Sequence, residues 1–138
     1  VKVNNRLVGK IKNGLVVLAG YESSDNSEDI YWMVQKIIKM RIFDDSENKL
    51  NFSILDVNGE ILLISQFTLH ASVKKGNRPS YIKAADSKKA KQMYDQTIRE
   101  FETLLKRKIS TGKFGANMEV SLVNNGPVTI TIDTKKKE

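Results

Sequence analysis

Cysteine is absent from the 138 residues of the chain, proline occurs only twice and histidine only once. Without cysteine the chain has no disulfide scaffold, no thiolate nucleophile and no zinc site built on cysteine ligands. No apolar run approaches the roughly 18 residues of a membrane-spanning helix, and no signal peptide is visible. The sequence therefore predicts no membrane segment and is compatible with a reducing compartment.

The single histidine, His70, limits the catalytic sites that the chain can build. It lies close in sequence to Ser65 and Thr68, which suggests a hydrolase triad completed by an aspartate. No Gly-x-Ser-x-Gly nucleophile elbow occurs, however, and we interpret His70 as an exposed loop residue. The acidic run 44–47 lacks the glycine and the terminal glutamate of a calcium loop. We therefore expect neither a metal site nor a cofactor.

Positive charge is in excess, with 23 Lys and Arg residues against 16 Asp and Glu residues and a net charge of +7. This excess favours a polyanionic partner or substrate, although each basic cluster could also be a solvated face. The cluster 135–137 fits a solvated tail. The candidates for contacts with an RNA backbone are Lys74, Lys75, Arg78 and Lys113.

Apolar patterning and turn residues predict one α+β domain over residues 1–138, with mainly antiparallel, barrel-like sheets and two main helices. The run 61–64 is apolar on both faces, so its strand should be central. Asn58-Gly59 predicts a hairpin between the strands on either side of it. The expected strands cover 1–3, 7–11, 15–21, 51–57, 60–66, 119–123 and 128–133; the expected helices cover 27–40, capped by Ser27, and 86–106, capped by Asp86 or Ser87.

Two polar stretches interrupt this pattern. Residues 124–129 separate two strand-like runs and fit an ordinary hairpin turn. Pro127, however, removes a backbone donor where strand pairing should begin, and Gly126-Pro127 is where we expect a cis peptide bond. Ser65-Gln66 ends the buried strand abruptly, and polar residues at such a position are often functional.

Together, residues 65–69 and 124–129 resemble the two signature motifs of the D-aminoacyl-tRNA deacylase (D-tyrosyl-tRNA deacylase) family. Residues 14–18, 41–43, 78–81 and 111–116 are also similar to that family, in its order, so the resemblance covers nearly the whole chain. Chains of this family usually begin with one further strand that carries a Gln-Arg pair. On this resemblance we expect a single deacylase domain that lacks the first strand, and the bracing role of its arginine stays unassigned.

The resemblance implies an enzyme that hydrolyses the ester of D-aminoacyl-tRNA, and of mischarged glycyl-tRNA, to release tRNA for chiral proofreading. It implies a cytoplasmic homodimer with active sites at the subunit interface, where residues 126–127 of one subunit reach the pocket of the other. The implied catalytic residues are Ser65, Gln66, Phe67 and Thr68. The implied residues for substrate binding and chiral selection are Phe114, Met118, Asn125, Gly126, Pro127, Val128 and Thr129.

On this resemblance, backbone amides near Phe67 and Thr68 would hold the ester carbonyl, and carbonyls of Phe114 and Gly126 would hold the substrate ammonium. Water assisted by the 2′-hydroxyl of the terminal adenosine would then attack. The rival is covalent attack by Thr68, which has no evident base. Two other classes stay open. One is a non-catalytic RNA-binding module; the other, a small-ester hydrolase, is disfavoured by the missing elbow.

Overall fold

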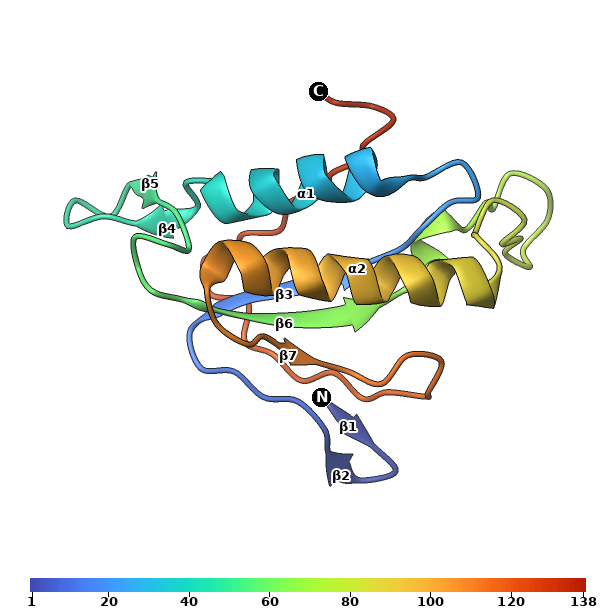
Figure 1. Ribbon diagram of the computed structural model, residues 1–138, viewed down its shortest axis with the longest axis horizontal. Helices are drawn as coiled ribbons and strands as arrows, with labels where there is room; N and C mark the ends of the chain where they lie inside the picture. The colour runs from blue at the N-terminus through green and yellow to red at the C-terminus, as the bar shows by residue number, and fades with distance from the viewer.

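The computed structural model describes residues 1–138 and contains two long helices and seven short strands (Figure 1). The α+β class with two main helices is confirmed, and no helix is both long and apolar enough to span a membrane. In chain order the elements are β1 (Lys2–Val3), β2 (Arg6–Leu7), β3 (Gly14–Ala19), α1 (Ser27–Lys39), β4 (Phe43–Asp44), β5 (Leu50–Phe52), β6 (Glu60–Ser65), the 3-10 helix η1 (Phe67–His70), α2 (Ser87–Leu105) and β7 (Ser110–Thr111).

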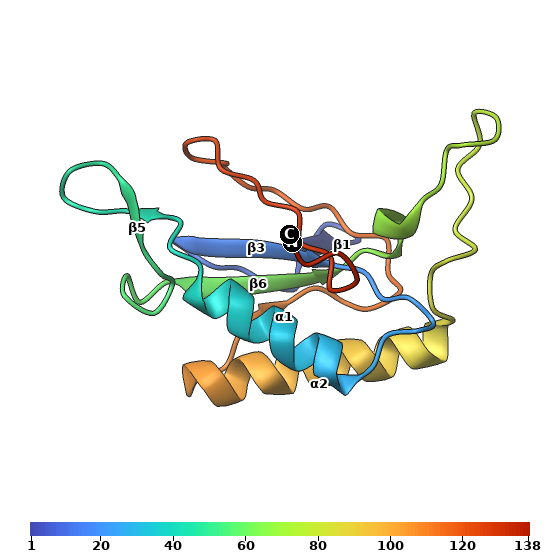
Figure 2. The ribbon, with the colours of Figure 1, turned by 90° about the horizontal axis from the view of Figure 1, so that it is seen from above.

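The strands form three separate sheets. β1–β2 and β4–β5 are two-stranded and antiparallel, whereas the largest sheet, in the order β3-β6-β7, is parallel. Parallel neighbours need long crossover connections, and α1 and α2 lie in the two crossovers. Both helices lie on the same side of β3 and β6 (Figure 2), as right-handed crossovers in one direction along a sheet require.

Strand β6 occupies the centre of this sheet, as its doubly apolar run predicts. Ile61 and Leu63 face the helices and join the main core with Val34 of α1 and Phe101 of α2. Leu62 and Ile64 face the opposite way, into a smaller core beneath the N-terminal segment. All four side chains of the run are at most 3% exposed, so the strand needs cover on both faces.

Local side chains fix both helix starts. Asn26, rather than the predicted Ser27, caps α1: its side chain accepts from the Glu28 amide at 2.9 Å, and Asp29 completes a capping box. Asp86 caps α2 as predicted, accepting from the Lys89 amide at 2.9 Å.

The hairpin predicted at Asn58-Gly59 is wrong. Strand β5 pairs with β4, and β6 pairs with β3 and β7. Residues 53–58 fold instead into a closed turn, in which the Asp56 carboxylate accepts from the Ser53 amide at 2.8 Å and from the Ser53 hydroxyl at 2.9 Å. This turn separates β5 from β6, and burial of both faces of β6 is better satisfied between β3 and β7.

The C-terminal hairpin predicted over 119–123 and 128–133 is also wrong within the single chain. Glu119 exchanges two hydrogen bonds with Lys2, but no backbone–backbone hydrogen bond involves residues 120–132. The Asn124 side chain takes the place of a ladder, accepting from the Val128 amide at 3.2 Å and donating to the Thr129 hydroxyl at 2.6 Å. Pro127, with no N–H, cannot donate to a ladder here.

Candidate functional site

The carboxyl ends of the three parallel strands meet at one edge of the sheet. Beyond β3 and β6, the Gln66 amide donates to the Ala19 carbonyl at 2.7 Å; beyond β7, the Gly112 amide donates to the Leu63 carbonyl at 3.1 Å. Loops that follow the carboxyl ends of neighbouring parallel strands are a common place for ligand sites. We call this region, formed by residues 20–22, 65–70 and 112–114, the carboxyl edge.

The predicted catalytic residues are held together at the carboxyl edge. Ser65 ends β6, and Gln66 immediately precedes η1, which contains Phe67 and Thr68. The Gln66 side-chain amide donates to the Thr68 hydroxyl at 2.5 Å, and no other side chain hydrogen-bonds to that hydroxyl. Thr68 therefore has neither an imidazole nor a carboxylate bonded to it that could act as its base.

The backbone of η1 offers donors beside that hydroxyl. The Leu69 amide donates to the Gln66 carbonyl at 3.3 Å. The amides of Phe67 and Thr68 precede it, at the start of the helix, where no intrahelical acceptor exists. Two adjacent amides of this kind can stabilise negative charge on a carbonyl oxygen.

His70 is not the exposed loop residue that we expected. It ends η1, its side chain is 21% exposed, and its Nδ1 lies 3.3 Å from Glu22 Oε1, while its Nε2 is buried without a partner. The ring packs against Gly20: a Cβ at Gly20 would lie 3.0 Å from His70 Cδ2 and 2.8 Å from the Gln66 carbonyl oxygen. Glycine at position 20 therefore lets η1 lie close to the end of β3.

Phe114 and Met118 flank the same edge. The half-buried Phe114 ring lies 5.6 Å from the Tyr94 ring, centroid to centroid, at 44°. The Tyr94 hydroxyl donates to the Leu63 carbonyl at 2.9 Å, and burial raises the pKa of Tyr94 to about 12. Met118 packs with Ile64 in the smaller core. In a single chain, Phe114 and Met118 are therefore part of the packed structure beside the carboxyl edge.

The other candidates, Asn125, Gly126, Pro127, Val128 and Thr129, lie elsewhere. The Gly126-Pro127 bond is cis, as predicted, and Gly126 has φ +132°, where a side chain is strained. Residues 124–127 are exposed, and Figure 2 shows the tip of this C-terminal segment at the opposite side of the molecule from η1. In a single chain residues 65–68 therefore do not share a pocket with the loop over 124–127, although Leu69 and residues 124–126, 128 and 129 line one large groove.

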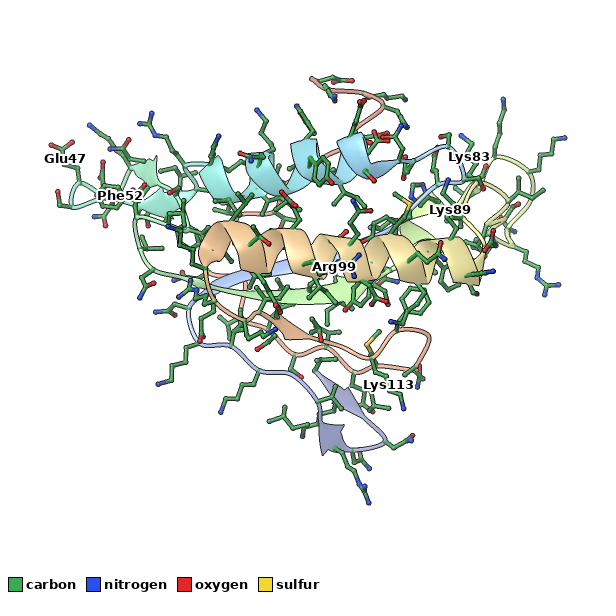
Figure 3. All side chains as sticks on the ribbon, viewed as in Figure 1. Glu47, Phe52, Lys83, Lys89, Arg99 and Lys113 are labelled. Atoms are coloured by element: carbon green, nitrogen blue, oxygen red, sulfur yellow. The ribbon has the colours of Figure 1, made fainter.

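The basic candidates gather near the carboxyl edge. Ser72 and Ser80 exchange two backbone hydrogen bonds of 2.8 and 2.9 Å, which close a protruding loop over residues 72–80. Lys74, Lys75 and Arg78 project from this loop, which we call the basic finger, and all three are exposed. Figure 3 shows Lys83 and Lys113 toward the same end of the molecule. None of these five cations forms an ion pair within the chain.

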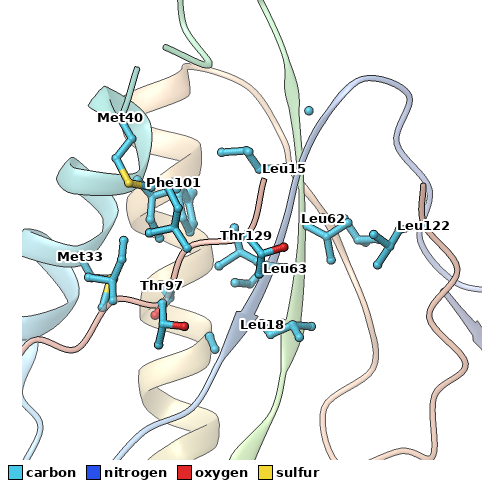
Figure 4. Close-up of a pocket in the computed structure, with 18 of the residues that line it drawn as sticks. Leu15, Leu18, Met33, Met40, Leu62, Leu63, Thr97, Phe101, Leu122 and Thr129 are labelled. Carbon is cyan, nitrogen blue, oxygen red and sulfur yellow. The ribbon is translucent and has the colours of Figure 1, made fainter. Parts of the chain in front are cut away.

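A large open groove of about 1610 Å³ lies along the sheet and the C-terminal segment, and it overlaps the carboxyl edge at residues 20–22, 69 and 70. Apolar side chains such as Leu15, Leu62 and Phe101 dominate its walls (Figure 4). It reaches Leu69 and His70 but not residues 65–68. No group of three or more His, Asp or Glu side chains is arranged to hold a metal ion.

Sequence reasoning did not identify Gly20 and Glu22, because it did not predict that β3 and β6 are parallel neighbours. Gly20 directly follows the apolar run of β3, and this position at the end of a buried strand was the signal that could have identified it as part of the candidate site. Tyr81 was noted only within the resemblance. Its ring lies 5.0 Å from the Phe67 ring, centroid to centroid, at an interplanar angle of 74°.

Comparisons with known proteins show the family and the fold. The family model described as D-Tyr-tRNA(Tyr) deacylase matches residues 1–133. The D-aminoacyl-tRNA deacylase of Flavobacterium psychrophilum is 53% identical over 138 residues, which cover 100% of this chain and 92% of that protein. A solved structure of the "c-Myc DNA Unwinding Element Binding Protein" is 35% identical, with a TM-score of 0.90 over 96% of this chain and 89% of the other. A structure of "a probable eukaryotic D-amino acid tRNA deacylase", 18% identical, shares the fold with a TM-score of 0.68 over 84% of this chain and 83% of the other. The chain belongs to the D-Tyr-tRNA(Tyr) deacylase family.

Proposed function

We propose that this protein hydrolyses the ester bond of D-aminoacyl-tRNA, and of glycine mischarged on tRNA, to release the free amino acid and tRNA. Family membership supports the reaction class. The observation that carries the mechanism is the pair of adjacent amides, Phe67 and Thr68, at the start of η1. They suit an ester whose carbonyl oxygen gains negative charge during attack.

The mechanism that fits this site uses water rather than an enzyme nucleophile. A water oxygen attacks the ester carbonyl carbon, and the carbonyl oxygen becomes an oxyanion beside the amides of Phe67 and Thr68. The bond from carbon to the 3′-oxygen then breaks, the 3′-oxygen takes a proton, and the carboxylate leaves. The neighbouring 2′-hydroxyl of the terminal adenosine assists by orienting the water and relaying its proton.

Thr68 is the less favoured nucleophile. Its hydroxyl accepts a hydrogen bond from Gln66, and no base is bonded to it, so nothing is placed to remove its proton. Gln66 instead holds the Thr68 side chain in one orientation beside the amides. A positioning role for both residues follows.

We propose that the working enzyme is a homodimer. The loop over residues 124–127 is exposed and lies away from η1 of its own chain, so it can complete a site only on a second copy. There Gly126, Pro127 and the flanking residues 125, 128 and 129 would form a wall of backbone carbonyls. The carbonyls of Phe114 and Gly126 would both accept hydrogen bonds from the substrate ammonium.

Such a wall would select chirality by exclusion. An L side chain would collide with backbone oxygens, which no change of rotamer can move. A D side chain would point away from the wall. Glycine has no side chain and would not be rejected. A difference of about 4 kcal/mol between the two enantiomers corresponds to roughly a thousandfold discrimination. Because backbone forms the wall, many different D-amino acids would be accepted.

Matched preparations of D-tyrosyl-tRNA and L-tyrosyl-tRNA test this proposal. We expect purified protein to release tyrosine from the D form about a thousandfold faster than from the L form. Equal rates for the two forms would refute the chiral filter, and no release from either would refute the reaction.

The second candidate is a non-catalytic nucleic-acid-binding protein. The net charge of +7 and the name of the 35% identical structure favour it. In the same experiment a binder would retard the tRNA in a native gel and leave the tyrosine ester intact.

A further inference from the structure

We propose that Phe67 and Tyr81 form a stacking surface for one nucleobase of the single-stranded 3′ end of the RNA, while the basic finger holds the neighbouring phosphates. This inference rests on the proposed function, because it assigns part of the substrate to this region. It concerns the side chain of Phe67, whereas the hydrolytic step uses only the backbone amide of that residue.

The two aromatic rings are unusually accessible for their size. Phe67 is 57% exposed and Tyr81 is 38% exposed. Their nearly perpendicular arrangement places the edge of one ring against the face of the other. An edge-to-face pair is favourable in itself and holds both rings in place, and it leaves aromatic surface open to a further planar group.

Positive charge without internal compensation lies in the segment that contains Tyr81. Lys74, Lys75, Arg78 and Lys83 all lie within residues 71–85, a stretch that contains no Asp or Glu. None of the four forms an ion pair. Single-stranded nucleic acids bind where a basic groove follows the phosphates and aromatic side chains stack on the bases. Aromatic pair and cations occur together here.

Backbone hydrogen bonds at both ends of the basic finger hold the finger and the Phe67–Tyr81 pair in place relative to the ester site. The Ala71 amide donates to the Thr68 carbonyl at 3.1 Å, which ties one end of the finger to η1. At the other end, the Ala85 amide donates to the Tyr21 carbonyl at 2.8 Å. Phe67 is the residue next to Thr68, so a base on its ring lies close to the esterified ribose.

Charge decides between RNA and a second copy of this chain as the occupant. The loop that a second copy is proposed to bring to this site, residues 124–127, contains no Asp or Glu, so it could not pair with the four cations, and desolvating them unpaired would be costly. An RNA end supplies one negative charge per nucleotide together with planar bases. We therefore assign this surface to the RNA 3′ end.

Binding of an unacylated RNA hairpin with a single-stranded CCA end tests the assignment, because it does not depend on hydrolysis. The probe carries a fluorophore at its loop, and anisotropy gives the dissociation constant at fixed salt. Three further probes each lack one of the last three bases. With wild-type protein, removal of one of these bases should weaken binding roughly 5- to 150-fold, as expected for loss of one stacked base.

Protein variants identify the stacking partner. Phe67→Leu should weaken binding of the intact RNA by a similar factor, and Phe67→Trp should restore it. The combination of Phe67→Leu with the sensitive abasic RNA should cause no further loss, because both changes remove the same contact. Tyr31→Leu is the matched control, since Tyr31 is 46% exposed on the outer face of α1 and should leave binding unchanged.

The finger is tested through salt dependence. Arg78→Gln should reduce the slope of log affinity against log salt by about 0.7 for a single strand, equally for intact and abasic RNA. Three results would overturn the assignment: equal affinity for all abasic probes, additive losses in the combined measurement, or a change in oligomeric state upon Phe67→Leu with RNA affinity unchanged. The abasic probes keep the test decisive if a variant fails to fold, because they use the wild-type protein. Failure here with intact D-specific deacylation would remove the stacking surface and leave the proposed function standing.

Discussion

Replacing Gly20 by alanine should disturb the candidate site through a single added methyl group. The new Cβ would stand 2.8 Å from the Gln66 carbonyl oxygen and 3.0 Å from His70 Cδ2. The carbonyl belongs to the backbone that begins η1, so it cannot turn aside as the end of a side chain can. The 3-10 helix must therefore move away from β3 by about 0.5 Å to restore an ordinary contact.

This displacement has two measurable consequences. Crowding in a packed region costs about 1–3 kcal/mol, and for a domain of this size each kcal/mol lowers Tm by about 4 °C. The amides of Phe67 and Thr68 move with the helix. Because a misplacement of about 1 Å can cost roughly a hundredfold in rate, about 0.5 Å should lower kcat/KM for D-tyrosyl-tRNA roughly tenfold.

Gly59→Ala is the matched control. Its Cβ would lie 2.9 Å from Ile54 Cγ1, an equally close contact, but at the opposite end of β6 from Ser65. Thermal unfolding followed by circular dichroism should show comparable losses of stability for both variants, and single-turnover deacylation should fall only in Gly20→Ala. If both variants retain wild-type rates, or if both lose activity in proportion to stability, the contact between Gly20 and η1 does not position the site.

Four other outcomes follow from the structure. Thr68→Ala should retain measurable deacylation, whereas tRNA ending in 2′-deoxyadenosine should react poorly with wild-type protein; an acyl ester trapped on Thr68 would contradict the water mechanism. Light scattering at micromolar concentration should give twice 15.6 kDa, and a species of only 15.6 kDa would contradict the shared site. Gly126→Ala, which strains a residue at φ +132°, should keep the fold but lose D-activity or gain L-activity; unchanged rates and selectivity would reduce the loop to a turn. Buried Tyr94 resists ionisation in the native state, with a pKa of about 12 against 10 unfolded, so urea midpoints should fall as pH rises from about 10 to 12, and Tyr94→Phe should flatten that fall.

Local chemistry in the sequence was enough to locate the helices and the central strand. Apolar patterning identified the helix over 86–106, whose buried face includes Met93, Tyr94 and Phe101, and Asp86 was one of the two expected caps. The run Ile61–Ile64, apolar on both faces, identified a strand with neighbours on each side. These features depend on residues close together in sequence, which periodicity reports directly.

Pairing between distant strands was not predictable in the same way. Asn58-Gly59 favours a two-residue hairpin, but Asp56 closes a different turn with Ser53, and β6 finds its partners far away in the chain. The carboxyl edge depends on that pairing, so Glu22 and His70 were not recognised as neighbours. The two signature motifs gave the residues of the candidate site, but not their separation within one chain.

Parallel pairing also determines when the carboxyl edge can exist. Leu15 pairs with Ile61, and Leu62 pairs with Ser110, so each ladder joins segments that are separated by at least one long helix. Contacts of such long range form only after most of the chain is available to fold. A nascent chain whose α2 and β7 have not yet emerged from the ribosome can hold Gln66 near Ala19. It still lacks Gly112 and Phe114 at the same edge. The complete edge therefore arises only after β7 and residues 112–114 have been synthesised, and a fragment that ends before β7 should not carry it.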